Sequence, residues 1–237
     1  MEHSSDVLGQ AWWDYWQGKK TAPLLLHTSY GTETEEMSVD YFFREETDFP
    51  PIERYALNLC RGQVLDVGAG TGVHAAHLLQ QGLMVSTLEV SPIGVRIQRA
   101  RGIKDAILSS YQDYAGRGCD TVLLLMNGIG VVGTLDGLRR FLQQATHWLR
   151  PGGQLLFDSS DIAYLYEEHP RPTETYYGEV RYCYEYRGQR GSWFGWLYVD
   201  FLTLEAIARE TGWRVQLIFQ EEDDQYLARL IKPDQNE

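Results

Sequence analysis

The stretch that most constrains the fold is a short apolar run followed at once by a glycine-rich turn, Val64-Leu65-Asp66-Val67-Gly68-Ala69-Gly70-Thr71-Gly72. Such a run, closed by glycines, predicts a buried strand over 63–67. Glycines lack a Cβ, so the chain can turn tightly and a ligand can lie against bare backbone. Val73 and Leu79 then predict a helix over 72–81, whose first amides face the turn.

A second strand carries an acid at its end. Residues 84–88 predict a strand that leads directly into Glu89. In a strand–helix–strand unit, a carboxylate at this point is placed to accept hydrogen bonds from both hydroxyls of a ribose. Together with the glycine turn, Glu89 predicts a nucleoside-binding site.

The glycine spacing narrows the choice of nucleoside. A dinucleotide-binding turn of the G-x-G-x-x-G type needs a glycine where this chain has Val73. The glycines fall instead at positions 68, 70 and 72, and Asp66 precedes the first of them by two residues. A glycine turn without any ligand is the plain alternative, and it requires Asp66, the three glycines and Glu89 to coincide.

This arrangement resembles the first motif of the class I S-adenosylmethionine-dependent methyltransferases. Their cofactor has a cationic sulfonium and an amino-acid tail instead of a pyrophosphate, so a carboxylate beside the turn is favourable. The segment Leu149-Arg150-Pro151-Gly152-Gly153-Gln154-Leu155 is similar to the motif before the family's fifth strand. Tyr41-Phe42-Phe43-Arg44, followed by Pro50-Pro51-Ile52-Glu53-Arg54, resembles an amino-terminal segment of small bacterial members.

The order of elements indicates an α/β fold. Strands and helices alternate from residue 63 to residue 158, which predicts a doubly wound, mostly parallel sheet. Residues 120–126 are apolar almost throughout, as expected for a strand covered on both faces. A helix over 204–211, capped by Thr203, and strands at 213–219 and 225–231 complete the pattern. The resemblance implies a seven-stranded, Rossmann-like sheet with its last strand antiparallel and next to the edge.

The alternation stops in an aromatic-rich segment, residues 159–201. Tyr182, Tyr184 and Tyr186 alternate with polar residues at the period of a strand. A glycine-bounded turn at 188–191 and a returning strand at 193–199 follow. We therefore expect an aromatic-rich β insertion after the fifth strand.

Three units follow from this division. Residues 1–50 form an amino-terminal cap, 51–158 with 202–237 form the cofactor-binding domain, and 159–201 form an inserted lid over the acceptor site. The aromatic residues of the insertion also suit a satellite core or a dimer interface, so a homodimer is possible. Trp12, with the neighbouring Trp13 and Trp16, suits packing and pocket lining equally.

The resemblance also implies which residues hold the cofactor. Asp66 and the glycine-turn backbone bind its methionine part, Glu89 binds the ribose, and Asn127 faces the methyl group and the acceptor. The family often has an acid after the third strand, where this chain has Ser110. The predicted cofactor-binding residues are Asp66, Gly68, Ala69, Gly70, Gly72, Glu89, Val90, Ser110, Tyr111, Asn127, Tyr41 and Arg44.

The catalytic residue is not identified by the sequence. Methyl transfer from a sulfonium is an in-line displacement, and alignment supplies much of the rate. A base matters only if the nucleophile arrives protonated. The candidates are Asn127, Asp158 and Tyr177, with Asp161 and His169 as further bases. Asp158 could instead cap the loop after its strand, and His169 suits the surface.

Charge and motifs indicate a small-molecule methyl acceptor. The formal net charge is −12, which disfavours nucleic acid. The segment Asn127-Gly128-Ile129-Gly130 lacks the Asn/Asp-Pro-Pro-aromatic motif of enzymes that methylate nucleic-acid amino groups, and the Pro-Cys pair of cytosine-attacking enzymes is missing. The alternatives are a protein methyltransferase, a nicotinamide-dependent oxidoreductase and a non-catalytic module that binds S-adenosylmethionine.

Cysteine and histidine spacing predicts no metal site. The three cysteines are odd in number and lack metal-type spacing, and His74 and His77 lack a third ligand. The cysteines suit a reducing compartment. The start of the chain lacks a continuous apolar region, and no apolar run reaches the length of a membrane span. We therefore expect a cytoplasmic protein that makes no membrane contact.

Overall fold

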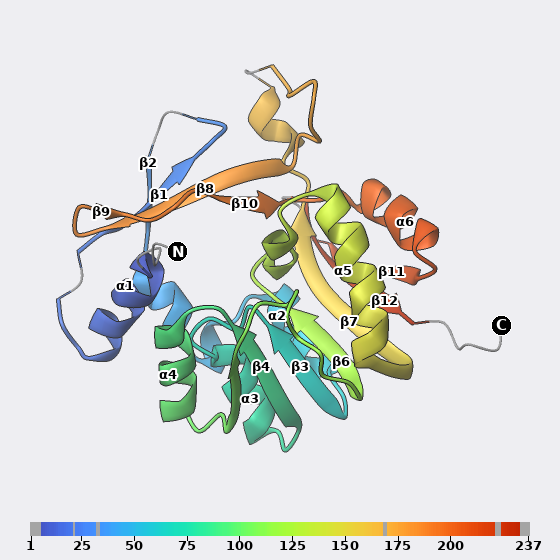
Figure 1. Ribbon diagram of the computed structural model, residues 1–237, viewed down its shortest axis with the longest axis horizontal. Helices are drawn as coiled ribbons and strands as arrows, with labels where there is room; N and C mark the ends of the chain where they lie inside the picture. The colour runs from blue at the N-terminus through green and yellow to red at the C-terminus, as the bar shows by residue number, and fades with distance from the viewer. Residues whose placement is uncertain (1–5, 21, 32–33, 168–169, 221–223, 233–237) are drawn as a thin grey trace.

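The computed structural model contains two β-sheets, one above the carboxyl edge of the other (Figure 1). It describes residues 6–20, 22–31, 34–167, 170–220 and 224–232. The main sheet has seven strands in the order β11-β12-β7-β6-β3-β4-β5. Its strands are β3 (Gln63–Val67), β4 (Met84–Glu89), β5 (Asp105–Leu108), β6 (Cys119–Leu124), β7 (Leu149–Ser160), β11 (Arg214–Gln220) and β12 (Gln225–Ile231).

The strand directions confirm the predicted fold. β3 pairs in parallel with β4 and β6, and the parallel pairing continues to β5 on one side and β7 on the other. β12 runs antiparallel to both β7 and β11 and lies between them. The sheet is therefore the doubly wound, mostly parallel sheet expected from the alternation, with its last strand next to the edge.

Helices cover both faces of this sheet because its side chains alternate between two hydrophobic clusters. Leu65 packs with α5 and α6 on one face, and its neighbour Val64 packs with α2 and α3 on the other. No helix in the described part of the chain is long and apolar enough to cross a membrane. The helices are α1 (Val7–Trp16), α2 (Pro51–Leu59), α3 (Val73–Gln80), α4 (Pro92–Ala100), α5 (Leu135–Trp148) and α6 (Phe201–Glu210), with short 3₁₀ helices η1 (Val39–Phe43), η2 (Glu46–Asp48), η3 (Gly128–Val132) and η4 (Ala163–Tyr166).

Two predicted boundaries are wrong. The sequence predicts a turn at 151–153 and a strand over 154–158, but β7 begins at Leu149, directly after α5, and includes 151–153. An irregularity between Cys119 and Thr121 of β6 accommodates the change of register. α6 begins at Phe201 because the side chain of Asp200, and not that of Thr203, caps it. The Asp200 carboxylate accepts a hydrogen bond from the Thr203 N–H at 2.9 Å.

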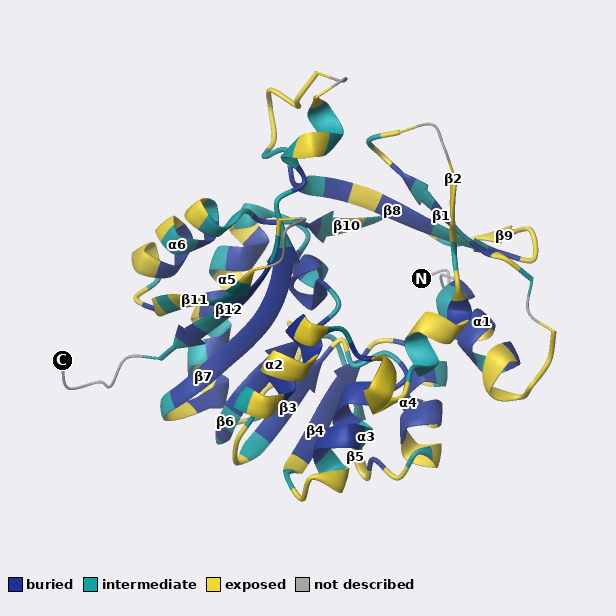
Figure 2. Cartoon of the chain, turned by 180° about the vertical axis from the view of Figure 1, so that it is seen from behind, coloured by how far each residue is buried: buried dark blue, intermediate teal, exposed yellow. Residues whose placement is uncertain are grey.

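The second sheet joins the two ends of the predicted lid. The insertion forms β8 (Glu179–Tyr186), β9 (Gln189–Arg190) and β10 (Phe194–Leu197), as its alternation predicts. Two amino-terminal strands that the sequence analysis did not predict, β1 (Leu24–Thr28) and β2 (Thr34–Met37), complete it. The order is β10-β8-β1-β2, with β9 paired to β8. Figure 2 shows β8 crossing above the carboxyl edge of the main sheet, with much of its length buried.

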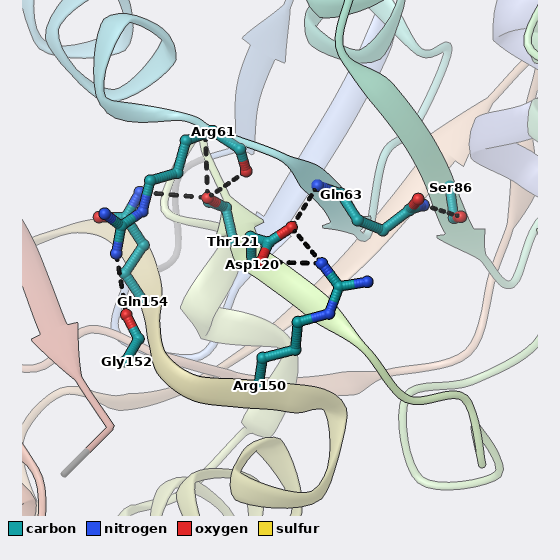
Figure 3. Close-up of polar contacts among 8 residues, drawn as sticks. All are labelled: Arg61, Gln63, Ser86, Asp120, Thr121, Arg150, Gly152 and Gln154. Carbon is teal, nitrogen blue, oxygen red and sulfur yellow. Dashed lines mark hydrogen bonds and ion pairs between the residues drawn. The ribbon is translucent and has the colours of Figure 1, made fainter. Parts of the chain in front are cut away.

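A polar network holds the amino ends of the central strands together (Figure 3). The Asp120 carboxylate accepts a hydrogen bond from the Gln63 N–H at 2.8 Å and pairs with the Arg150 guanidinium at 2.8 Å. Thr121 and Gln154 share a further hydrogen bond of 3.1 Å. The hydrogen bond from Gln63, aided by Arg150, lowers the pKa of Asp120 below its ordinary value of 3.8.

We predict that Asp120→Ala destabilises the protein by about 1–2 kcal/mol, because a half-exposed charged hydrogen bond is lost. Since the folded-state pKa is depressed, this contribution is present above the ordinary pKa of 3.8 and disappears as pH falls through the lower folded value. Urea unfolding at pH 7 and near pH 3 measures both effects. Glu205→Ala, which breaks an exposed helix pair, serves as the control and changes stability by less than about 0.5 kcal/mol. An equal loss from Asp120→Ala at both pH values contradicts the prediction.

Candidate active site

A cavity of about 1660 Å³ separates the carboxyl edge of the main sheet from the inner face of the second sheet. One half of its lining comes from the loops that follow β3, β4 and β5. The other half is an aromatic wall carried by the second sheet and the loops that join it. We define the aromatic wall as Tyr30, Tyr182, Tyr184, Phe194, Trp196 and Tyr198.

The glycine turn after β3 forms one edge of the cavity. The N–H groups of Gly68 and Ala69 both donate to the Leu88 carbonyl oxygen, at 2.9 and 3.1 Å, which ties the turn to β4. Gly70 has a φ of 56°, a left-handed conformation that favours glycine. The space where its Cβ would stand reaches the Trp12 ring, 3.7 Å away. The turn therefore lines the cavity with backbone that carries no Cβ at Gly68 or Gly70.

Glu89 lies at the end of β4 and bridges the turn to α4. Its carboxylate accepts hydrogen bonds from the Gly70 N–H at 2.7 Å and from the Ser91 N–H at 2.8 Å. Burial raises the pKa of Glu89 to about 7, against the opposing effect of these amides. Each carboxylate oxygen has two lone pairs, so both oxygens can accept a further hydrogen bond from a ligand hydroxyl.

Asp66 lies within β3 and lines the same half of the cavity. Burial raises its pKa to about 6, and the nearby His74 opposes that rise. Its Oδ2 is buried and finds no hydrogen-bond partner among the described residues. A buried carboxylate oxygen without a partner is costly, and a donor or cation supplied by a ligand removes that cost.

Asn127 stands where the two halves of the cavity meet. It follows β6 with a φ of 52°, and its N–H donates to Asp158 Oδ2 at 2.9 Å. Its Nδ2 donates to the carbonyl oxygen of Leu197 in β10, 3.2 Å away. Within the described part of the chain, Asn127 Oδ1 has no partner although it is buried. This oxygen is available to accept a hydrogen bond from a ligand.

The other catalytic candidates lie behind the cavity lining. Asp158 is buried beneath Asn127, and its Oδ2 also accepts from Gln225 at 2.9 Å. Burial raises the pKa of Asp158 to about 6, and these hydrogen bonds oppose the rise. The Tyr177 hydroxyl donates to Asp161 at 2.6 Å, so both groups are engaged with each other. His169 lies outside the described residues.

The amino-terminal candidates lie on the far side of the glycine turn. Tyr41 lines the cavity, and the Arg44 guanidinium lies 3.8 Å from the centre of its ring. Arg44 does not line the cavity; it donates to Glu53 at 2.7 Å, and Glu53 also contacts His74 at 2.7 Å. Burial alone would raise the pKa of Glu53, but His74 and Arg44 together bring it below its ordinary value.

The remaining predicted residues divide into lining and packing positions. Val90, which is 68% exposed, lines the cavity together with Ser110 and Tyr111. Gly72 does not line it. Its φ of 79° favours glycine, and a Cβ there would lie 2.6 Å from the Ile103 side chain and 2.9 Å from that of Gln98 in α4.

Three residues of the site were missed in the sequence. Gly94 lets α4 approach the turn, since a Cβ there would lie 2.9 Å from both the Glu89 side chain and the Gly70 carbonyl oxygen. Gln98 donates to that same carbonyl oxygen at 2.8 Å. Asp6 caps α1 and accepts from the Ser91 hydroxyl at 2.6 Å. The spacing of Ser91, Gly94 and Gln98 places them along one face of a helix, and this spacing could have indicated that α4 packs against the glycine turn.

Comparisons with known proteins agree with this geometry. Residues 43–217 match the protein family described as "Methyltransferase domain". The crystal structure of an S-adenosylmethionine-dependent methyltransferase from Bacteroides fragilis, in complex with S-adenosyl-L-homocysteine, is 34% identical. It superimposes with a TM-score of 0.89 over 98% of this chain and 97% of that one. This chain belongs to the S-adenosylmethionine-dependent methyltransferases.

Two more distant proteins resemble this methyltransferase. The mitochondrial ubiquinone biosynthesis O-methyltransferase of Schizosaccharomyces pombe is 22% identical over 164 residues, which cover 67% of this chain. That match spans only 54% of the longer yeast protein. The sugar N-methyltransferase KedS8 from a Streptoalloteichus species is 14% identical, with a TM-score of 0.57 over 86% of this chain and 96% of that one. It shares the fold.

The lining fits the cofactor of this family. Asp66 Oδ2 and Trp12 Nε1, both buried without a partner among the described residues, supply an acceptor and a donor. The turn at Gly70 leaves its backbone open, and the acids nearby favour a cationic sulfonium. Asp66, Glu89 and the turn would thus hold the amino-acid tail and the ribose.

We predict that Glu89→Ala weakens the binding of S-adenosylhomocysteine by about 1.5–3 kcal/mol, the scale of hydrogen bonds to a charged group. Isothermal titration calorimetry measures the affinity, and circular dichroism checks the fold. Glu89→Gln keeps an accepting oxygen and loses less, and the exposed Glu205→Ala loses nothing. Unchanged affinity in a correctly folded Glu89→Ala variant rules out the ribose assignment.

Proposed function

We propose that this methyltransferase transfers a methyl group from S-adenosylmethionine to a small-molecule acceptor held in the same cavity. One observation carries the proposal. The glycine turn and Glu89 face the aromatic wall across a single cavity, and Asn127 lies between them. A ligand on each side would place its reacting atoms near Asn127.

The bound cofactor would supply an electrophilic methyl carbon on a cationic sulfur. The protein's own part is to bind, to align and to exclude water. Holding the two reactants in line accounts for a large share of the rate of such reactions. The second sheet covers the acceptor half, and its apolar side chains keep water from the reacting atoms. Asn127 Oδ1 would orient a donor group of the acceptor.

The shape of the site favours a small acceptor over a polymer. Strands β8 and β10 cover the acceptor half. The described residues therefore do not form the long open groove that a protein substrate needs. The net charge of −12 disfavours a polyanion such as nucleic acid. The yeast relative is named for ubiquinone biosynthesis and the KedS8 protein for sugar methylation, which supports a small acceptor.

The lid assignment is part of this proposal. Residues of the amino-terminal segment and of the insertion share one sheet whose inner face lines the cavity. We infer that this sheet encloses the acceptor. A dimer interface on the same segment stays the alternative.

A metabolite screen tests the proposal. Purified protein with S-adenosylmethionine is incubated with a small-molecule extract, and mass spectrometry follows metabolites that gain one methyl group. We expect one compound or a few related compounds to gain it. Gly70→Val serves as the inactive control, because a side chain at that left-handed position strains the glycine turn and is directed at the Trp12 ring beside it.

Calorimetry on the same protein separates the rival functions. S-adenosylhomocysteine should bind at micromolar levels and NAD should not bind. Binding of NAD without S-adenosylhomocysteine would sink the proposal. If the cofactor binds and no metabolite gains a methyl group, but a protein does, the result favours a protein acceptor.

A further inference from the structure

The cavity lining contains no cationic side chain of lysine or arginine among the described residues. None of the residues outside the description is lysine or arginine either. Four acids do line the cavity: Asp6, Asp66, Glu89 and Asp224. The lining also includes His74, whose Nε2 lies 2.7 Å from the Glu53 carboxylate, so this ring is already engaged with an acid.

The Arg44 guanidinium, which contacts the lining residue Tyr41, is already paired. Arg44 stacks on the Tyr41 ring and donates to the Glu53 carboxylate at 2.7 Å. A carboxylate or phosphate bound in the acceptor half would have no lysine or arginine among the lining residues as its counter-charge. Burying an unpaired charge is costly. The cavity therefore selects against anionic acceptors.

The acceptor half is lined by aromatic rings in place of charged side chains. Tyr182 and Tyr184 lie on the same face of β8, and Tyr182 stands opposite Phe194 in the register. Trp196 follows on the same face of β10, and a side chain at Gly130 would collide with its ring at 2.2 Å. The position of the Trp196 ring therefore depends on the absence of a side chain at Gly130. Aromatic faces of this kind attract a cation within about 6 Å.

Neutral oxygens complement these faces. The Tyr182 hydroxyl donates to the Tyr198 hydroxyl at 3.0 Å, and the Tyr30 ring meets the Tyr182 ring edge-on at 6.3 Å. Burial raises the pKa of Tyr30 and of Tyr182, so both stay neutral phenols. Phenolic oxygens, with Asn127 Oδ1, accept hydrogen bonds from N–H donors.

We propose that the acceptor is a small molecule with a basic amino group and no carboxylate or phosphate, held by the aromatic wall through that amino group. This inference rests on the proposed function. A basic amine bound as its ammonium ion would first release one proton to water. The neutral amine would then give its lone pair to the methyl carbon, forming a C–N bond as the C–S bond breaks and sulfur leaves as a thioether. The positive charge passes to nitrogen, which then releases a proton to water.

A hydroxyl acceptor fits this half less well. A hydroxyl must lose its proton as it reacts. The aromatic wall itself offers only neutral phenols and rings. Asp224 lines the cavity outside that wall, and Asp158 lies beneath Asn127, outside the lining. An amine that reacts as its free base needs no such group. The wall then stabilises the positive charge that the nitrogen gains.

Three probes of one shape test the inference: benzylamine, benzyl alcohol and benzoate. Each is titrated by calorimetry into protein saturated with S-adenosylhomocysteine. We expect benzylamine to bind at least about tenfold more tightly than benzoate, with benzyl alcohol between them. Trp196→Leu and, separately, Tyr184→Leu should reduce benzylamine binding severalfold more than benzyl alcohol binding.

Trp193→Leu is the matched control. Trp193 belongs to the same segment but is exposed, contacts Arg181 and does not line the cavity, so its removal should leave all three affinities unchanged. The second variant, Tyr184→Leu, keeps the test valid if Trp196→Leu does not fold. Benzoate binding as tightly as benzylamine, or equal losses for benzylamine and benzyl alcohol in the variants, overturns the inference. Failure of S-adenosylhomocysteine to bind instead overturns the proposed function. The three probes are therefore also titrated into the protein without S-adenosylhomocysteine, where their order still tests the inference.

Discussion

The backbone pairing of β1 with β8 is the interaction on which the enclosed cavity depends. Leu24 to Thr28 pair antiparallel with Tyr186 to Tyr182, which joins segments about 158 positions apart in the chain into one sheet. Without β1, the insertion would be a short hairpin of β8 with β9 and β10. Isolated hairpins are marginally stable in water, whereas three or more strands with an apolar face are stable. The pairing thus turns two flanking segments into a roof for the main sheet.

The amino-terminal segment also reaches the cofactor half. α1 is fixed to α4 by the hydrogen bond between Asp6 and the Ser91 hydroxyl, and Trp12 of α1 lies over Gly70. The same segment therefore supplies the sheet above the acceptor and the helix above the glycine turn. Displacement of α1 would be expected to disturb both halves together, because β1 follows it after a short connection.

Much of the fold was predictable because its signals are local. The glycine turn, the apolar strands of the main sheet and the apolar stripe of α5 each lie within one short segment, and burial in the structure follows them. β1 was not predictable in the same way. Its five residues carry no strong alternation, and the partner that makes it a strand lies far along the chain.

The residues of the site also differ in how far the sequence predicts them. The positions of Gly70 and Glu89 beside the cavity were predictable from their spacing, because Glu89 ends β4 and Gly70 lies in the turn that follows β3. Asp158 and Tyr177 have the right chemistry for bases, but residues distant in sequence engage them: Asn127 and Gln225 hold Asp158, and Asp161 accepts from Tyr177. The sequence offers no sign of such partners, since hydrogen bonds between distant segments appear only once the fold brings them together.

The most direct test of the central claim, that one cavity roofed by the second sheet serves both ligands, is a crystal structure of the chain with S-adenosylhomocysteine. The account predicts ligand density between the glycine turn and Glu89, with the ribose hydroxyls within hydrogen-bond distance of that carboxylate and the sulfur directed toward Asn127. The space against the aromatic wall should stay free for the acceptor. Density that fills the aromatic half, or that lies outside the cavity, would contradict the account.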